Sequence, residues 1–290
     1  MNIPLISDIK RFSVHDGDGI RTTVFFKGCS LKCVWCHNPE SISAKPQIAY
    51  FSNNCINCGE CVDVCEHNAH IIRNDKHILN YDLCSTCGRC EDVCLGQAIK
   101  IYGKSLDIDE LVEILISDKK FYDNSNGGVT FSGGECLLYD DFCCELAKKL
   151  KEHNIHIAID TCGFVNRSAF EKIAPFTDLF LYDIKAIDPQ THIKCTGQSN
   201  KLILDNLKYI DTLNIPIYIR IPYVPEYNDC EIDKIAEYIQ TFKNIRRVDV
   251  LAYHNYASSR YQALNLTNTL PKTIPDSVEI SKAQSKCIVK

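Results

Sequence analysis

The sequence has no long apolar run and no excess of basic residues, and each absence excludes a class of protein. No stretch of its 290 residues approaches the roughly 20 apolar positions that a membrane-spanning helix needs. The opening residues, MNIPLISDIKRF, contain no apolar segment of the kind that directs secretion, so we expect a cytoplasmic protein. A net charge of −5 gives no electrostatic basis for binding nucleic acid or an anionic membrane, and we expect neither as a partner.

Cysteine, by contrast, is abundant, with 18 in the chain. In a reducing compartment, thiols this frequent are more often metal ligands than disulfides. Eleven lie between Cys29 and Cys94, and eight of these lie between Cys55 and Cys94, in a polar segment rich in Asn and Gly. We therefore predict that residues 49–102 form a small inserted module held together by metal rather than by a large core.

The remaining sequence alternates between short apolar segments and helical patterns. Strands are expected at 22–28, 128–134, 155–160, 178–184, 215–221 and 248–253, and helices near 107–121, 139–153, 201–213 and 231–243. Asp107, followed by Glu110, predicts a cap on the first of these helices. Strands that alternate with helices are typical of βαβ units and a parallel sheet, and six strands are too few for a closed eight-stranded barrel.

The predicted fold is therefore α/β, a partial (β/α)6 barrel interrupted by the insert. Residues 1–48 begin the barrel and carry its cysteine-rich loop, and residues 103–256 complete it. The structure of the tail, residues 257–290, is left open because its periodicity is weak.

The insert contains the same cysteine spacing twice, in CINCGECVDVC at 55–65 and CSTCGRCEDVC at 84–94. C-x2-C-x2-C-x3-C is the pattern of bacterial two-cluster ferredoxins, in which the fourth cysteine of each run ligates the other cluster. It predicts two ferredoxin-like [4Fe–4S] clusters, one on Cys55, Cys58, Cys61 and Cys94 and one on Cys84, Cys87, Cys90 and Cys65. Glu66 and Leu95 replace the proline that usually follows. A zinc site would instead use ligand sets without the crossed fourth cysteine.

Residues capable of chemistry follow each predicted strand, and the first strand is followed by C-x3-C-x2-C at Cys29, Cys33 and Cys36. Ligands of parallel α/β sheets bind at the carboxyl ends of the strands, so we expect these residues to form one site. Three thiolates on one loop can hold three irons of a [4Fe–4S] cluster and leave the fourth iron open to another ligand. A three-ligand zinc site is the alternative.

This loop resembles the signature of the radical S-adenosylmethionine (SAM) superfamily, C-x3-C-x-aromatic-C, with Trp35 at the aromatic position. The string HDGDGIRTTVFFKGCSLKCVWCHNPE, with SGGE, IDTCG, YDIK, YIRIPYVP and AYH further on, is similar to the glycyl-radical-enzyme activating enzymes over about residues 9–256. The insert resembles that of the longer members of this family.

The resemblance implies a catalytic cluster on Cys29, Cys33 and Cys36 that binds and reductively cleaves SAM. The resulting 5′-deoxyadenosyl radical would take hydrogen from a glycine of a partner glycyl radical enzyme. A flavodoxin or ferredoxin is the expected electron donor. The two insert clusters would relay the electron, with stabilisation or docking as the alternative roles.

The resemblance also implies roles for individual residues. Gly133, Gly134 and Glu135 match a motif that receives the methionine amino group, and a glycine pair suits this role because a side chain would block close approach of the ligand. The positions that match a monovalent-cation site near the cofactor are Asp160, Thr161 and Asp183, and capping of strand–helix turns is the alternative for them. Further cofactor-binding positions are Trp35, His37, Asp160, Asp183, Ile184, Lys185, Arg220 and His254. Lys185 and Arg220 are expected to neutralise the carboxylate, and a purely structural role is the alternative for His254.

Two groups of residues remain open. Asp16 and Arg21 match a segment at which the partner's glycine loop enters, although a glycine-rich turn is the alternative. The remaining cysteines receive no function. Cys136 and Cys162 are interpreted as small buried hydrophobes, with a soft residue near the pocket as the alternative. The others show no ligand spacing: Cys143, Cys144, Cys195, Cys230 and Cys287. Rival functions are a radical SAM enzyme acting on a small molecule or peptide and a non-catalytic electron carrier. The sequence does not indicate which glycyl radical enzyme is the partner.

Overall fold

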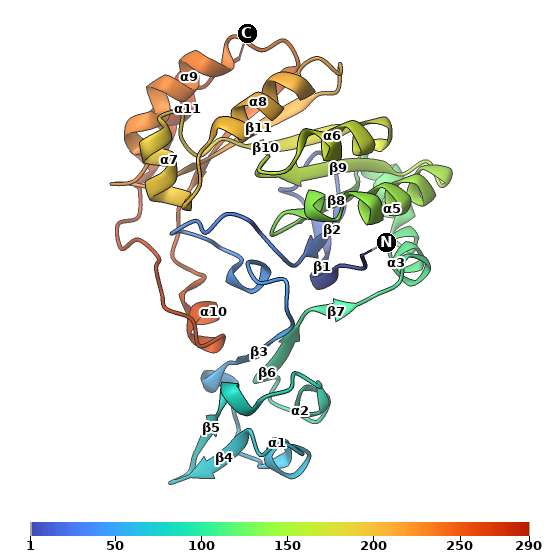
Figure 1. Cartoon of the computed structure of the whole chain (residues 1–290), viewed down its shortest axis with the longest axis vertical. Coiled ribbons are helices and arrows are strands. Elements are labelled where there is room, and N and C mark those ends of the chain that lie inside the picture. The colour runs from blue at the N-terminus through green and yellow to red at the C-terminus, as the bar shows by residue number, and fades with distance from the viewer. Residues whose placement is uncertain (1, 290) are drawn as a thin grey trace.

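An eight-stranded sheet forms the centre of the larger part of the molecule (Figure 1). The computed structural model describes residues 2–289. The strands lie in the order β12-β11-β10-β9-β8-β2-β1-β7. Six of them are parallel: β2 (Arg21–Phe26), β8 (Gly128–Gly133), β9 (His156–Thr161), β10 (Leu179–Asp183), β11 (Ile217–Tyr223) and β12 (Ile245–Ala252). β1 (Leu5–Ser13) and β7 (Lys104–Ser105) extend the β2 edge in antiparallel orientation.

The six parallel strands confirm the six predicted ones, with bounds that differ by a few residues. Within residues 2–289 the outermost strands β12 and β7 do not pair with each other, so the sheet is open. Sequence reasoning missed β1 because its residues, LISDIKRFS, mix apolar and charged side chains without strict alternation. It also missed β7, which has only two residues.

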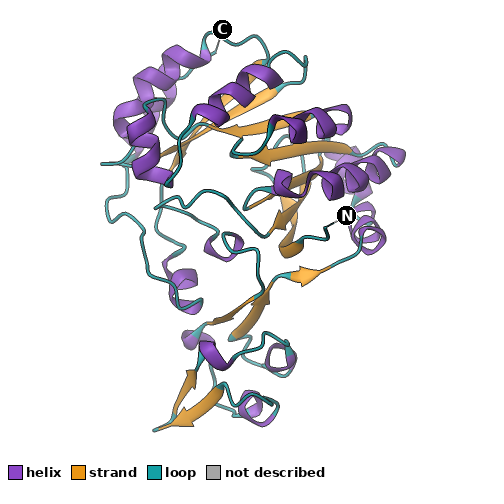
Figure 2. Cartoon of the chain, in the orientation of Figure 1, coloured by secondary structure: helices purple, strands orange, loops and turns teal. Residues whose placement is uncertain are grey.

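Helices cover the outer side of this sheet (Figure 2). They are α3 (Ile108–Ile116), α4 (Lys119–Ser125), α5 (Asp140–Glu152), α6 (Arg167–Ile173), α7 (Pro189–Thr196), α8 (Lys201–Ile210), α9 (Ile232–Ile239) and α11 (Ser277–Lys286). Single-turn 3-10 helices lie at Pro39–Ser41, Ser52–Asn54, Tyr81–Leu83, Cys136–Tyr139, Ala174–Phe176 and Asp229–Glu231. No helix within residues 2–289 combines the length and the apolar character that crossing a membrane requires.

The four predicted helices are present, but the first is divided into α3 and α4. Asp107 caps α3 as expected, because its side chain accepts a hydrogen bond from the Glu110 N–H at 2.8 Å. The division falls next to Asp118, whose buried carboxylate accepts hydrogen bonds from Arg11 of β1 and Thr22 of β2 at 2.7 and 2.8 Å. The sequence did not predict α6 and α7, which have only 7 and 8 residues and so show little periodicity.

Along the parallel strands, successive side chains alternate between the apolar core on the outer side of the sheet and the inner side. Phe131, Ile159 and Tyr182 point outward into the main apolar core beneath the helices and are fully buried. The residue that follows each of them, at positions 132, 160 and 183, is polar and faces the inner side, because successive side chains of a strand point to opposite faces. Each fully buried aromatic stabilises the fold by about 1.5–3 kcal/mol, so the register that places polar groups at the inner strand ends is firmly held.

Residues 47–102 form a separate extension below the sheet in Figure 1. It contains two antiparallel pairs, β3 (Gln47–Tyr50) with β6 (Ile99–Tyr102) and β4 (His70–Arg73) with β5 (Lys76–Leu79). Two four-residue helices accompany them, α1 (Glu60–Asp63) and α2 (Arg89–Asp92). The two cysteine runs have the same backbone, since Gly59 and Gly88 precede these helices with φ of 89° and 88°, a conformation that favours glycine.

The tail that the sequence left open connects the parts of the molecule. Its first helix, α10 (Ser258–Ala263), lies between the sheet and the extension (Figure 1). Tyr81 of the extension donates a hydrogen bond to the Ala263 carbonyl at 2.7 Å. The Gln284 side chain of α11 accepts from the Val250 N–H and donates to the Val248 carbonyl on β12, both at 2.8 Å. The tail therefore protects the β12 edge of the open sheet.

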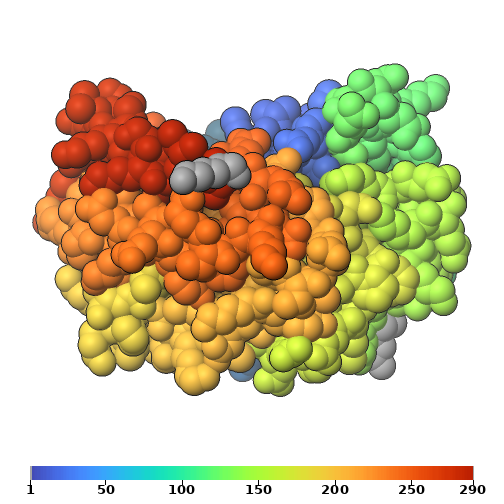
Figure 3. Space-filling model, turned by 90° about the horizontal axis from the view of Figure 1, so that it is seen from above, coloured from blue at the N-terminus to red at the C-terminus, as the bar shows by residue number. Residues whose placement is uncertain are grey.

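The loop between β1 and β2 reaches across the inner side of the open sheet. Asp16 accepts a hydrogen bond from Thr23 at 2.8 Å, and Asp18 accepts one from Tyr218 of β11 at 2.5 Å. Seen from above, the blue N-terminal segment lies between the green helices and the red C-terminal one (Figure 3). The loop thus links strands from opposite halves of the sheet.

Candidate functional site

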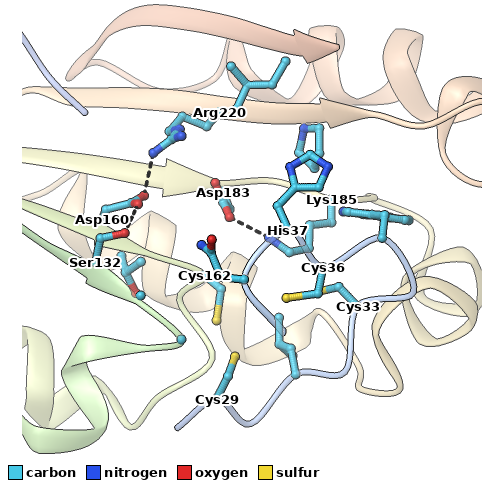
Figure 4. A pocket seen from close by; sticks show the side chains of 18 of the residues that line it. Cys29, Cys33, Cys36, His37, Ser132, Asp160, Cys162, Asp183, Lys185 and Arg220 are labelled. Carbon is cyan, nitrogen blue, oxygen red and sulfur yellow. Dashed lines mark hydrogen bonds and ion pairs between the residues drawn. The ribbon is translucent and has the colours of Figure 1, made fainter. Parts of the chain in front are cut away.

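A cavity of about 210 Å³ lies at the carboxyl ends of the parallel strands, between them and the loop that follows β2 (Figure 4). Most residues that the sequence singled out line it: Cys29, Cys33, Trp35, Cys36, His37, Gly133, Gly134, Asp160, Thr161, Asp183, Lys185 and Arg220. The lining does not include Glu135, Ile184 or His254.

The three-cysteine loop is fixed by backbone hydrogen bonds to distant segments. The N–H groups of Cys29 and Val34 donate to the carbonyls of Ile42 and Cys195, both at 3.0 Å. Figure 4 shows the sulfur atoms of Cys29 and Cys36 pointing toward the same space. Burial raises the pKa of the Cys33 thiol and raises that of Cys36 to about 12. Metal ions supply the positive charge that holds such buried thiols as thiolates, and this soft donor set suits iron–sulfur clusters or zinc.

Two ion pairs occupy the opposite wall. Arg220 lies 3.0 Å from the Asp160 carboxylate, which also accepts a hydrogen bond from Ser132 at 2.6 Å. Burial raises the pKa of Asp160 to about 6, although the nearby Arg220 charge opposes this shift. Lys185 lies 2.6 Å from Asp183. Burial acts to lower the pKa of Lys185, but the charges of Asp183 and of the nearby Cys33 and Cys162 together outweigh burial, and the pKa is raised. The wall therefore offers two cations and two carboxylates, a complement to a zwitterionic ligand.

Gly133 ends β8 and Gly134 follows it, and both lie very close to the backbone that leads from β2 into the cysteine loop. A Cβ added to Gly134 would lie 2.2 Å from the Gly28 carbonyl oxygen, and one added to Gly133 would lie 2.3 Å from the Phe26 backbone. The expectation was that a side chain here would block the ligand. The structure gives another reason for glycine, because a side chain would first push away the loop that carries the cysteines.

Glu135 lies behind the cavity wall, with its side chain fully buried. Its carboxylate accepts hydrogen bonds from the Thr161 hydroxyl at 2.8 and 2.9 Å, from the Cys162 N–H at 2.9 Å and from the Leu137 N–H at 3.1 Å. Burial raises its pKa, and these hydrogen bonds oppose the shift. In this structure the carboxylate joins β8 to β9, and it is not exposed to receive an amino group as the resemblance implied.

His254 and Ile184 support the wall from outside the cavity. The rings of His37 and His254 stack with centroids 4.1 Å apart, and the His37 Nε2 atom lies 2.9 Å from the His254 carbonyl oxygen. Burial, together with His254, lowers the pKa of His37 to about 4, so its ring is neutral at pH 7. Ile184 is 1% exposed within the apolar core, and its N–H donates to the Arg220 carbonyl at 3.0 Å. Both residues position neighbours that do line the cavity.

The structure corrects the expectation for Arg21, which cannot contact a partner because it is fully buried. Its guanidinium donates to Thr130 and to the Val129 carbonyl, both at 2.7 Å, and so braces β2 against β8. Burial lowers its pKa to about 10. Asp16 lies 3.8 Å from Arg220, which places it beside the inner wall.

Several lining residues received no role from the sequence, among them Ser132 and Cys162. The signal for Ser132 was its place one residue after a buried core side chain, the same place that Asp160 and Asp183 occupy. The Cys162 thiol lies beside Cys29 (Figure 4), and a hydrogen bond between them lowers the pKa of Cys29. Cys162 had been interpreted as a small buried hydrophobe, and its place in the lining matches the alternative, a soft residue near the pocket.

The extension contains two further cavities, each lined by four cysteines. One is lined by Cys55, Cys58, Cys61 and Cys94, and the other by Cys65, Cys84, Cys87 and Cys90. These are the crossed sets predicted from the repeats. Backbone N–H groups point at sulfur in both, from Asn57 and Ala98 in the first at 3.5 and 3.2 Å, and from Ala69 and Thr86 in the second at 3.3 and 3.4 Å. Such hydrogen bonds accompany iron–sulfur ligation.

Comparisons with known proteins agree with this geometry. The model of the family described as the radical SAM superfamily matches residues 23–239. The chain is 44% identical over 266 residues to a trans-4-hydroxy-L-proline dehydratase activating enzyme of Clostridioides difficile, which covers 90% of this chain and 88% of that protein. It is 40% identical over 268 residues to a choline trimethylamine-lyase activating enzyme of Oleidesulfovibrio alaskensis, covering 90% and 86%. Streptococcus suis SuiB, solved bound to its precursor peptide SuiA, shares the fold with a TM-score of 0.54 at 14% identity over 89% of this chain and 42% of that one.

Proposed function

The chain belongs to the radical SAM superfamily, and we propose from this premise that it is the activating enzyme of a glycyl radical enzyme. The observation that carries the proposal is the cavity in which the three-cysteine loop faces the charged ends of the parallel strands. The curated relatives support it, because they are activating enzymes that match about 90% of the chain.

The cavity residues fit SAM and a [4Fe–4S] cluster. Such a cluster, when bound, supplies the electron that cleaves SAM to methionine and a 5′-deoxyadenosyl radical, which takes hydrogen from a glycine of the partner. Cys29, Cys33 and Cys36 would hold three irons, and Lys185 and Arg220 would bind the methionine carboxylate in place of the carboxylates they now pair with. The stacked His37 and the buried Trp35 would exclude water from the site.

A monovalent cation is proposed beside the cofactor, held by the carboxylates of Asp160 and Asp183. The support is that both carboxylates line the cavity. Thr161 would contribute only its backbone, because its hydroxyl donates to Glu135. If the side chains of Lys185 and Arg220 turn toward the cofactor, the cation would supply the positive charge that they now provide to Asp183 and Asp160.

We also propose that the chain is a longer-type member with a ferredoxin-like two-cluster insert at 49–102, between barrel segments 1–48 and 103–256 and before the tail at 257–290. The crossed cysteine sets and their matched N–H···S contacts support two auxiliary [4Fe–4S] clusters, and so three clusters in all. These clusters would pass electrons from a flavodoxin or ferredoxin toward the cavity.

The partner is proposed to be a glycyl radical enzyme that presents its glycine loop to the cavity. The relatives do not favour one particular glycyl radical enzyme as the partner. The chain is similarly identical, 44% and 40%, to an activating enzyme of a dehydratase and to one of a lyase.

The test is electron paramagnetic resonance of a candidate partner after anaerobic incubation with the reconstituted, reduced protein and SAM. A glycyl radical that depends on both proteins is expected, and Cys33→Ala is the control that should abolish it. The rival radical SAM function would be favoured if 5′-deoxyadenosine formed in the presence of a small molecule or peptide while none of the candidate partners acquired a glycyl radical. Iron analysis should give about 12 irons per chain.

A further inference from the structure

A pair of buried histidines connects the two four-cysteine cavities of the insert. His70 and His77 lie on opposite strands of the β4–β5 hairpin and are 3% and 8% exposed. The His70 Nδ1 and His77 Nε2 atoms are 2.9 Å apart. His77 lines the cavity of Cys55, Cys58, Cys61 and Cys94, whereas His70 lines that of Cys65, Cys84, Cys87 and Cys90. One hydrogen bond therefore runs from the wall of one cavity to the wall of the other.

The pair also reaches a cysteine sulfur. The His77 Nε2 atom lies 3.5 Å from the Cys61 sulfur, and the Tyr50 ring packs edge to face against the His77 ring with centroids 4.4 Å apart. His77 is thus held between Tyr50, His70 and Cys61 and has little freedom to turn away from the sulfur.

The surroundings of His77 favour one tautomer. A neutral imidazole carries one N–H, on either Nδ1 or Nε2. The His77 Nδ1 atom is buried with no partner among the described residues. A proton on Nδ1 would be an unpaired buried donor, which costs about 1–3 kcal/mol. With the proton on Nε2, the N–H points at both the His70 Nδ1 atom and the Cys61 sulfur.

The internal repeat provides a natural comparison. The backbone N–H···S contacts are equivalent in the two halves, Asn57 and Ala98 in one and Thr86 and Ala69 in the other. In the part of the chain that the structure describes, no side-chain N–H lies within hydrogen-bond distance of the cysteines of the second set. Ile99 occupies the position of His70 in the second repeat. The His77 imidazole is therefore a side-chain N–H donor that the first ligand set has and the second lacks.

We propose that His77 donates its Nε2–H to the Cys61 thiolate and raises the reduction potential of that cluster above the potential of its neighbour, with His70 as the positioning residue that fixes the His77 tautomer. This inference rests on the two-cluster insert of the proposed function. A hydrogen bond to a ligating sulfur stabilises the reduced cluster, which carries one more negative charge. The two auxiliary clusters are then inequivalent, and the one on Cys61 is reduced first.

The test is a redox titration of the fully reconstituted protein, followed by electron paramagnetic resonance of the reduced auxiliary clusters. His77→Phe keeps a planar ring and removes the N–H. It should lower the potential of one auxiliary cluster by about 59 mV, the equivalent of a tenfold change for one electron, and leave the other unchanged. His77→Gln can restore a donor and should recover part of the shift, and His70→Phe should give a smaller shift of the same cluster. His67→Gln, an exposed histidine at the second cavity, is the control and should change neither potential.

Several outcomes would overturn the inference. Unchanged potentials in His77→Phe at full iron content, or equal shifts of both clusters, would show that His77 does not tune its neighbour. Loss of about four irons in that variant would mean that the ring is needed to assemble the cluster. A stoichiometric zinc ion that both histidine variants release would assign Cys61, His70 and His77 to a different metal site. If the wild-type protein holds only about four irons, the two-cluster insert itself is wrong, and iron analysis shows this before any variant is titrated.

Discussion

Substitution of Gly134 by alanine tests why a pair of glycines stands at the end of strand β8. The added Cβ would lie 2.2 Å from the Gly28 carbonyl oxygen and 2.5 Å from that of Ser41. Both are backbone atoms of the segment that carries or anchors the three cysteines. Contacts below 3.0 Å are essentially never found for a real Cβ, so this segment would have to move by about 0.8 Å, the difference between 3.0 and 2.2 Å.

Forced overpacking of this kind costs typically about 1–3 kcal/mol. The displaced loop should also bind its cluster poorly. We therefore expect Gly134→Ala to lower the melting temperature and to reduce the iron content from about 12 to about 8 per chain, even when no SAM is present. Anaerobic scanning fluorimetry and iron analysis measure these two effects.

Gly197→Ala is the matched control, because nothing lies within 4 Å of its added Cβ and only the strain of φ +77° remains. It should cost about 1–2 kcal/mol and keep all its iron. If Gly134→Ala instead kept its melting temperature and iron and lost only SAM binding, the glycine would serve the ligand alone and the packing argument would be refuted.

Three further substitutions test other parts of the site. Glu135→Gln should destabilise the fold by about 1–3 kcal/mol in thermal melts, since the amide NH2 leaves one buried backbone N–H without an acceptor; loss of SAM affinity at unchanged stability would contradict this. Asp160, whose pKa burial raises to about 6, binds its proton more tightly in the folded than in the unfolded chain, where aspartate titrates near 3.9. Wild-type stability relative to Asp160→Asn should therefore fall as the pH rises from about 4 to about 6 and then level off, and a rise over this range would be inconsistent with it. Two double variants test whether the ligand sets cross. With crossed sets, the variant with Cys65→Ala and Cys84→Ala should lose about four irons, and the variant with Cys65→Ala and Cys55→Ala should lose about eight. With uncrossed sets, the two iron losses would be exchanged.

The sequence predicted those features of the fold that depend on local pattern. Apolar runs identified the six parallel strands, and cysteine spacing grouped the cysteines that line the three cavities. The edge strand β1 was missed because its stability comes from pairing with β2, which its own residues do not reveal. The tail was also missed, since α10 and α11 are held by contacts with Tyr81 and with β12.

The candidate site was predictable as a set of strand ends but not as a geometry. Asp160, Asp183 and Arg220 lie at or near the carboxyl ends of their strands, and parallel strands bring such residues to one edge. Which of the matched residues face the cavity depends on contacts between strands. Glu135 turns away because Thr161 on the next strand donates to it, and no spacing along the chain encodes that contact.

The most direct test of the central claim is whether the reconstituted protein, reduced with dithionite under strict anaerobiosis, converts SAM to 5′-deoxyadenosine and methionine. A radical SAM activating enzyme should form both products by liquid chromatography, and Cys33→Ala should form neither while it retains about eight irons. Absence of 5′-deoxyadenosine from a wild-type sample that contains about 12 irons per chain would contradict the account and leave the chain as an electron carrier.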